Sequence, residues 1–235
     1  MVKLSRLFTS TPGRKYLMAA TGLALVLFTV VHLLGNLTLY SHNGDSINAY
    51  AAKLESLGVG LIVLEVGLAL TIVLHLITAV QVTFTSKSAR PKGYEVQKSK
   101  GGPTKNNVTS RNMIVTGLVL AIFLGIHLWQ FRFGPEMEDG YTATVNGVMV
   151  HDLYRVVVEA FVQLKWVVFY VCSMFFLGFH LRHGFWSAFQ SLGAINPRWS
   201  KPIYALGLMI ALLLTFGFLF IPIFIYFTQH GGGNA

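Results

Sequence analysis

The sequence predicts an all-α integral membrane protein with five transmembrane helices, and three observations support this. Of 235 residues, 54% are hydrophobic and only 11% are charged, whereas a soluble domain carries about a quarter charged residues. Five apolar stretches reach the roughly 20 residues that cross the hydrocarbon layer as a helix. Lysine and arginine are concentrated in alternate connections between these stretches. We therefore expect residues 1–235 to form a single transmembrane domain, a helical bundle.

Polar or charged connections separate the five expected helices. The first covers about 14–40 and the second about 59–85. The third covers about 112–131, and the fourth and fifth cover about 156–189 and 202–227. Barrel strands would be shorter and would alternate in polarity, so α-helices are the spanning structure that fits. The first apolar run is far longer than the roughly 7–15 residues of a signal-peptide core, and we interpret it as a retained helix.

The basic residues predict the orientation of the helices, because cytoplasmic connections of membrane proteins are rich in Lys and Arg. They occupy the N-terminal tail, the second-to-third connection and the region of the fourth-to-fifth connection: Lys3, Arg6, Arg14, Lys15, Lys87, Arg90, Lys92, Lys98, Lys100, Lys105, Arg111, Arg182, Arg198 and Lys201. Acidic residues mark the other two connections: Asp45, Glu55, Glu136, Glu138, Asp139 and Asp152. We expect the N-terminus in the cytoplasm and the C-terminus outside.

Charge and cysteine usage exclude several classes of function. The net charge of +9 does not indicate nucleic-acid binding, because the basic residues lie in connections rather than along one helix face. Cys172 is the only cysteine, so the chain has no disulfide framework, thiolate zinc site or iron–sulfur cluster. It also lacks a C-x-x-C-H motif, so any haem would be held without covalent attachment.

Four expected helices carry histidines within the span, and ionisable residues there are costly and usually functional. These histidines are His32, His75, His127 and His180. His32 and His127 lie nearer the outer ends of their helices, whereas His75 and His180 lie nearer the cytoplasmic ends. At about 1.5 Å per residue, the two levels are roughly 15–20 Å apart along the bilayer normal.

Two histidines at one depth on facing helices are what axial ligation of a haem iron by two imidazoles requires. We therefore predict two haem b groups, one held by His75 and His180 and the other by His32 and His127. Iron with both axial positions filled does not readily bind oxygen, which favours electron transfer. Scattered structural histidines and a proton relay are the alternatives.

Residues near the histidines agree with haem binding. Gly22 and Gly35 lie on the same helix as His32 and would give a flat macrocycle room between helices, although small residues also serve plain helix packing. His183 is a rival to His180 as a ligand. Haem propionates need partners at a membrane edge, and an interfacial anchor is the alternative role for each candidate: Arg14, Lys15, Arg182 and His183.

Four motifs carry a family resemblance. They are Ser10–Ala19 (STPGRKYLMA), His32–Leu37 (HLLGNL), Asn48–Ala51 (NAYA), and Phe179-His180 with Gly184 and Trp186 downstream. In order and context they resemble the dihaem cytochrome b subunit of succinate:quinone oxidoreductases, the succinate dehydrogenase and quinol:fumarate reductase family. The similarity covers all five helices and the spacing of all four ligands, and it favours His180 over His183.

The resemblance implies a subunit of the bacterial inner membrane that anchors an iron–sulfur subunit and a flavoprotein subunit on the cytoplasmic side. The haem of His75 and His180 would be proximal to the iron–sulfur subunit, and that of His32 and His127 distal. The quinone, commonly menaquinone, would react near the distal haem, and dicarboxylate chemistry would occur on a partner. One fumarate reductase relative has a glutamate two residues before its fourth ligand for proton transfer; Gly178 stands there in this chain and puts that route in doubt.

Two charged residues, Glu65 and Lys165, lie within the outer halves of expected spans. An ion pair between them is one interpretation. The other assigns Lys165 to a haem propionate and Glu65 to proton handling at the quinone, because quinone chemistry moves two protons with two electrons. For that role we rank Glu65 and Glu55 ahead of His42 and His151.

Two further functions remain as alternatives. The chain could be the cytochrome b anchor of another quinone-linked complex, such as formate dehydrogenase or hydrogenase. It could also be a non-haem transporter with a histidine proton relay, although the inverted repeats and broken helices expected of many transporters are not evident in the sequence.

Overall fold

A computed structural model describes residues 8–41, 43–88 and 112–231 of the chain. Lys3, Arg6, His42, Arg111 and most of the basic second-to-third connection lie outside these residues. Five described helices are long and apolar enough to cross a membrane, and the other regular elements are short. The prediction of an all-α, multi-pass membrane protein is confirmed.

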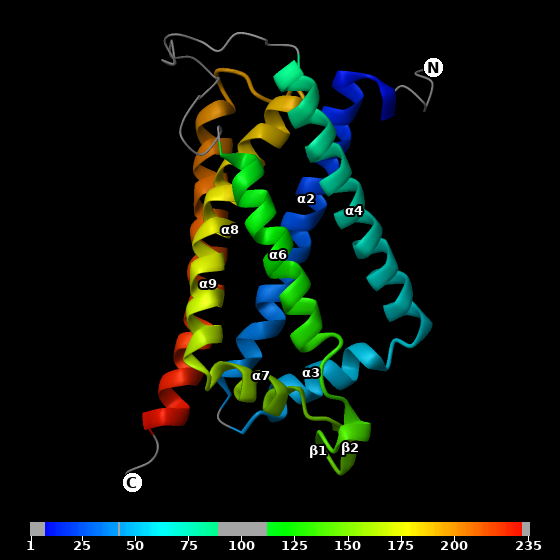
Figure 1. Ribbon diagram of the computed structural model, residues 1–235, viewed down its shortest axis with the longest axis vertical. Helices are drawn as coiled ribbons and strands as arrows, with labels where there is room; N and C mark the ends of the chain where they lie inside the picture. The colour runs from blue at the N-terminus through cyan, green and yellow to red at the C-terminus, as the bar shows by residue number, and fades with distance from the viewer. Residues whose placement is uncertain (1–7, 42, 89–111, 232–235) are drawn as a thin grey trace. The chain divides into compact units, whose positions relative to one another are not determined.

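The five long helices are α2 (Thr11–Asn36), α4 (Val59–Ser88), α6 (Met113–Phe131), α8 (Leu164–Ser191) and α9 (Ser200–Gly231) (Figure 1). A short 3-10 helix, η1 (Leu37–Tyr40), continues from α2. Their bounds are close to those expected, with one exception.

The exception is the expected fourth helix, which was predicted to begin near residue 156. The chain instead forms a separate helix, α7 (Leu153–Phe161), before α8 begins at Leu164. Helix α7 buries Val156 and Val157 and exposes the side chains of Arg155 and Glu159. It is therefore an amphipathic surface helix and not the first turns of a membrane span.

The described chain divides into two compact units, which we describe separately. Unit 1 consists of Met1–Phe28, Val66–Leu118 and Gly178–Leu212, and unit 2 of Thr29–Glu65, Val119–Leu177 and Leu213–Ala235. Each long helix contributes one segment to each unit.

Unit 2 contains the short elements that follow α2 and α6. These are α3 (Asp45–Glu55), the 3-10 turn η2 (Met137–Asp139), β1 (Thr142–Val145), β2 (Val148–His151) and α7. The two strands pair antiparallel, with Val145 opposite Val148. Asn146 and Gly147 form the turn with φ of 52° and 79°, the left-handed conformation that a two-residue hairpin turn requires.

A buried amide joins α3 to α7 within unit 2. Asn48 is 3% exposed; its side chain donates to Asp152 at 2.9 Å and accepts from the backbone N–H of Tyr154 at 2.9 Å. Because Asp152 also caps the N-terminus of α7 through the N–H of Arg155, this one amide orients the start of the helix. The apolar core around it contains Leu39, Ile47, Val157, Phe161, Val167, Tyr170, Ile221 and Ile225.

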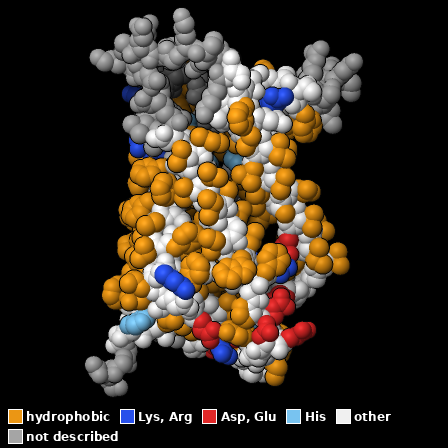
Figure 2. All heavy atoms as spheres, viewed as in Figure 1, with side chains coloured by type: hydrophobic (Ala, Val, Ile, Leu, Met, Phe, Trp, Pro, Cys, Tyr) orange, Lys and Arg blue, Asp and Glu red, His pale blue; other side chains and the backbone are white. Residues whose placement is uncertain are grey.

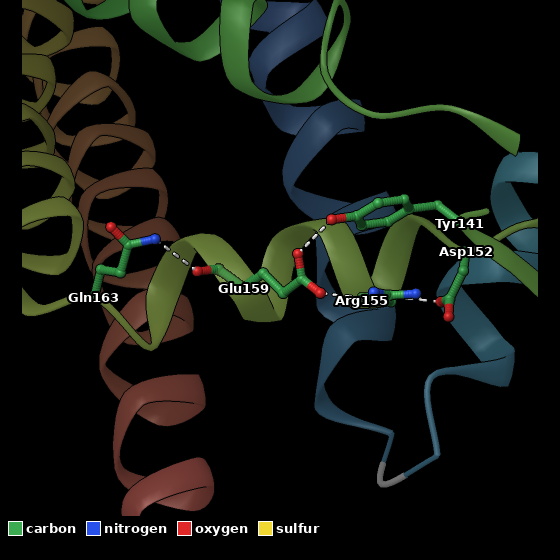
Figure 3. A network of polar contacts seen from close by, with 5 residues as sticks. All are labelled: Tyr141, Asp152, Arg155, Glu159 and Gln163. Atoms are coloured by element: carbon green, nitrogen blue, oxygen red, sulfur yellow. Dashed lines mark hydrogen bonds and ion pairs between the residues drawn. The ribbon is translucent and has the colours of Figure 1, made fainter. Parts of the chain in front are cut away.

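A polar network covers the exposed face of α7 (Figure 3). The Tyr141 hydroxyl donates to Glu159 at 2.6 Å, and Arg155 Nε donates to the same carboxylate at 2.8 Å. The Arg155 guanidinium also lies 4.3 Å from the centre of the Tyr141 ring. The hydrogen bonds from Tyr141 and Arg155 hold the pKa of Glu159 below its ordinary value.

The two units differ in charge. The chain has nine Asp and Glu residues; Glu95 lies outside the described residues, and the other eight all belong to unit 2. The described charged side chains of unit 1 are therefore basic only: Arg14, Lys15, Arg182, Arg198 and Lys201. Figure 2 shows acidic side chains gathered around the short elements and hydrophobic side chains over the long helices.

Candidate functional site

Each unit contains one of the two predicted histidine pairs. His75 and His180 belong to unit 1, and His32 and His127 belong to unit 2. The rings pair as the sequence predicted, and each pair is described within its own unit.

In unit 1, His75 of α4 faces His180 of α8. The ring centroids are 6.5 Å apart and the ring planes are inclined at 73°. No corresponding ring contact joins His183 to His75 among the described residues. The geometry thus favours His180 over His183 as the partner of His75.

Two threonines support these rings, and each comes from the preceding long helix. Thr21 of α2 places its Oγ1 3.1 Å from Nδ1 of His75. Thr116 of α6 places its Oγ1 3.1 Å from Nδ1 of His180. Both threonines are buried, at 8% and 6% exposure, so water does not compete for these contacts.

A glycine follows each of these threonines and makes room for the same ring. A Cβ added to Gly22 would lie 3.2 Å from Cε1 of His75, and one added to Gly117 would lie 3.5 Å from Cε1 of His180. Gly22 therefore accommodates an imidazole. Gly35, which was also considered as relief for a macrocycle, instead lies against the Tyr50 ring, where an added Cβ would come within 2.7 Å.

In unit 2, His32 of α2 faces His127 of α6. The ring centroids are 5.7 Å apart and the planes are inclined at 89°. Aromatic rings flank both, with Phe123 stacked 5.6 Å from His127 and Phe218 tilted 5.7 Å from His32. Nδ1 of His127 lies 3.3 Å from the Tyr170 hydroxyl.

The two rings of the unit 2 pair have different polar partners. Tyr170 donates its hydroxyl proton to Gln130 Oε1 at 2.8 Å, so its oxygen is available to His127. The Asn36 amide nitrogen lies 3.4 Å from Nε2 of His32 and also donates to the His32 carbonyl at 2.8 Å. Metal binding through Nε2 of His32 requires this amide to turn away.

The pairs can be tested against the dimensions of a bis-imidazole iron site. An imidazole nitrogen binds a first-row metal at about 2.0–2.1 Å, and the ring centre lies roughly 1.1 Å behind it, so two axial rings have centroids about 6–6.5 Å apart. The observed 6.5 Å and 5.7 Å lie at and slightly below this range.

The number of ligands also fits a porphyrin better than a bare metal ion. In the described part of the chain, no three His, Cys, Asp or Glu side chains converge as a metal-ion site would require. A haem supplies four equatorial nitrogens itself and needs only two protein ligands. One apolar 18-residue stretch of α4 has no buried residue, whereas Thr78 of the same helix is 2% exposed.

Glu65 pairs with Arg132 and not with Lys165. Arg132 Nε and Nη2 donate to the two carboxylate oxygens at 3.0 and 3.1 Å, a bidentate arrangement. The hydrogen bond with Glu65, followed by the charges of Glu65, Glu136 and Glu55, raises the pKa of Arg132. The two ranked carboxylates, Glu65 and Glu55, thus act on one cation. Lys165 lies 5.3 Å over the Trp166 ring.

The remaining predicted site residues are placed within unit 1. Arg14 donates to the Phe8 carbonyl at 2.9 Å and to Thr85 Oγ1 at 3.3 Å, which joins α2 to α4. Arg182 donates to the Tyr204 hydroxyl of α9 at 2.6 Å. Helical periodicity puts Arg182 about 200° around α8 from His180, so its assignment to a propionate stays a prediction, as does that of His183.

The sequence did not predict the residues that contact the histidine rings from other helices: Thr21, Thr116 and Tyr170. It also did not predict Arg132 as the partner of Glu65. One signal was available. Thr21-Gly22 precedes His32 by eleven residues and Thr116-Gly117 precedes His127 by eleven residues, an internal repeat in α2 and α6.

Comparison of the chain with protein-family models, with curated proteins and with solved structures finds no match. The resemblance to succinate:quinone oxidoreductase anchors therefore rests on the sequence motifs. What the structure adds is the pairing of the four histidines two by two.

Proposed function

We propose that this chain is the dihaem cytochrome b anchor of a succinate:quinone oxidoreductase, carrying electrons between an iron–sulfur subunit and a membrane quinone. The observation that carries the proposal is the facing of His75 with His180 and of His32 with His127, at centroid separations of 6.5 and 5.7 Å. Each couple comes from two different helices, so its two imidazoles would hold one haem between them.

The four imidazoles would hold two haem b groups through their ring nitrogens. When bound, haem b supplies one-electron redox chemistry. The protein's own contribution would be to hold each group between two imidazoles, with Phe123, Phe218 and other aromatic rings packed around the unit 2 pair. This environment favours electron transfer over oxygen binding.

The quinone reaction needs proton exchange as well as electrons, and we assign this to the carboxylates beside Arg132. Glu65 is held by two hydrogen bonds to Arg132, and Glu55 ends the nearby helix α3. A carboxylate placed near a quinone ring can give and take the two protons that accompany reduction.

The charge distribution supports the proposed orientation in the bacterial inner membrane. The described residues of unit 1 carry basic side chains and no acid, whereas all eight described acids belong to unit 2. Under the positive-inside rule, the basic N-terminal tail and second-to-third connection of the sequence, which belong to unit 1, would put that unit on the cytoplasmic side. The iron–sulfur and flavoprotein partners would then bind at the end that carries the His75–His180 pair.

The test is a redox-titrated visible spectrum of the purified complex with single histidine variants. We expect two b-type haems in the wild type. His75→Ala and His180→Ala should each remove one of them, and His32→Ala and His127→Ala the other, whereas His183→Ala should retain both. Absence of haem from the wild type would refute the proposal and favour a transporter.

A second measurement separates the proposed complex from other haem-bearing anchors. Succinate should reduce the haems of the membrane-bound complex, and formate or hydrogen should not. Reduction by formate or hydrogen would instead favour a formate dehydrogenase or hydrogenase anchor. Glu65→Gln should retain both haems and lose quinol-dependent turnover.

A further inference from the structure

Three of the four paired histidines meet a hydroxyl oxygen through the same ring nitrogen, Nδ1. The contacts are Thr21 with His75 at 3.1 Å, Thr116 with His180 at 3.1 Å, and Tyr170 with His127 at 3.3 Å. The hydroxyl comes in each case from a different helix than the histidine.

The protons of these hydroxyls are already committed to other acceptors. Thr21 donates to the Leu17 carbonyl at 2.7 Å and Thr116 to the Met113 carbonyl at 3.1 Å, which are the back-bonds that threonine commonly makes in a helix. Tyr170 donates to Gln130 at 2.8 Å. Each hydroxyl oxygen therefore acts as an acceptor towards the ring.

This direction of donation determines the tautomer of the imidazole. A neutral histidine has one N–H and one nitrogen with a lone pair. If Nδ1–H donates to the hydroxyl oxygen, the lone pair is on Nε2, which is the nitrogen left to bind iron. The opposite direction would protonate Nε2 and block ligation.

The two threonines also occupy equivalent places in an internal repeat. Each begins a Thr-Gly pair eleven residues before a paired histidine, Thr21 before His32 and Thr116 before His127. Eleven residues make about three helical turns, so threonine and histidine share one face of their helix. One face of α2 and one face of α6 thus each carry a paired imidazole and a hydroxyl that supports an imidazole from the next long helix.

We propose that Thr21, Thr116 and Tyr170 are positioning residues that fix the tautomer and the ring orientation of His75, His180 and His127. This inference rests on the proposed haem-binding function. Hydrogen bonds of this kind raise ligand basicity, and their loss typically lowers metal affinity about 10–100-fold. A more basic imidazole favours ferric over ferrous iron, so the hydroxyls lower the reduction potential.

The test replaces each hydroxyl without changing the shape of the side chain: Thr21→Val, Thr116→Val and Tyr170→Phe. Thr71→Val is the matched control, because Thr71 is on α4 one turn from His75 and its hydroxyl donates to the Gly67 carbonyl of its own helix. The readouts on the purified complex are the haem-to-protein ratio, the midpoint potential of each haem and the low-spin ferric EPR signal.

We expect Thr21→Val and Thr116→Val to change the same haem and Tyr170→Phe to change the other. Loss of the hydroxyl should favour ferrous iron and so raise the midpoint potential of that haem. A tenfold change in the ferric-to-ferrous ratio at one ambient potential corresponds to about 59 mV for one electron. The EPR signal of the same haem should change, because its imidazole is freer to rotate. Thr71→Val should leave both haems as in the wild type.

Serine variants distinguish positioning from plain packing. Thr21→Ser and Thr116→Ser keep the hydroxyl and lose a methyl group, so they should restore the wild-type potential, or the haem itself if the valine variant loses it. Potentials and EPR signals unchanged in all three hydroxyl-free variants would overturn the inference, as would serine variants that behave like valine. A wild-type protein without haem would instead refute the proposed function.

Discussion

Replacing Gly22 by alanine should disturb the His75–His180 pair, whereas the same change at Gly117 should not. The methyl group of Gly22→Ala would lie 3.2 Å from Cε1 and 3.7 Å from Nδ1 of His75. That of Gly117→Ala would lie 3.5 Å and 4.0 Å from the same atoms of His180, which is ordinary van der Waals contact. Only the first forces a ring to move, by a few tenths of an ångström.

The magnitude follows from the size of the clash. Overpacking by one methyl group costs about 1–3 kcal/mol. Replacing glycine by alanine also stabilises the helix by up to about 1 kcal/mol, because alanine has the higher helix propensity. The second effect is common to both variants and cancels in their comparison. Gly22→Ala should therefore retain the proposed haem more weakly than Gly117→Ala by about 1–3 kcal/mol, roughly a 5- to 150-fold difference in occupancy under competition.

The assay is haem retention during timed incubation with a haem-binding competitor in detergent, followed by the visible spectrum. Circular dichroism of the same samples shows whether the helices stay folded. Equal retention by the two variants, or faster loss from Gly117→Ala, would refute the assignment of Gly22 as steric relief for His75.

Three further changes test other parts of the structure. Gly217→Ala places a methyl group 2.6 Å from Cδ2 of Leu33 and should lower stability by about 1–3 kcal/mol in thermal unfolding, whereas Gly67→Ala meets nothing within 4 Å and should not. Glu65→Gln and Arg132→Gln, combined in a double-mutant cycle, should show a coupling of about 0.5–1 kcal/mol in detergent; zero coupling would exclude the pair. Because the pKa of folded Glu159 is lowered by Tyr141 and Arg155, its contribution is present above the pKa of the unfolded chain and is lost as pH falls through the folded pKa. Glu159→Gln should therefore lower the melting temperature at neutral pH, and the difference should vanish in acid.

The membrane helices and the histidine pairing were predictable because both depend on position along one helix at a time. Apolar length gives the span, and the distance of a histidine from each end gives its depth. His75 and His180 could therefore be paired from sequence, and the 6.5 Å ring separation agrees with that prediction. Helix α7 was missed because its apolar residues run on towards α8, and length alone does not reveal a break at residues 162 and 163.

The supporting contacts were not predictable in the same way, because they depend on which helix lies beside which. The sequence of α4 does not predict the contact between Thr21 and His75. The residues around Glu65 likewise do not predict Arg132 as its partner. The hairpin is different. Asn146-Gly147 between two short runs that contain Thr and Val is a strong local turn signal, so β1 and β2 could have been found from sequence.

If each repeat is extended to the next long helix, from α2 to α4 and from α6 to α8, the two second helices differ at a position that bears on the proton exchange proposed for Glu65. On the second helix of each repeat, the position ten residues before the paired histidine is Glu65 for His75 and Tyr170 for His180. Tyr170 supports His127, whereas Glu65 in the equivalent place bonds to Arg132. The repeats thus match at the threonines and differ at this position. The proton exchange proposed for the quinone needs a group that gives and takes protons, and of these two equivalent positions only the one on α4 carries a carboxylate.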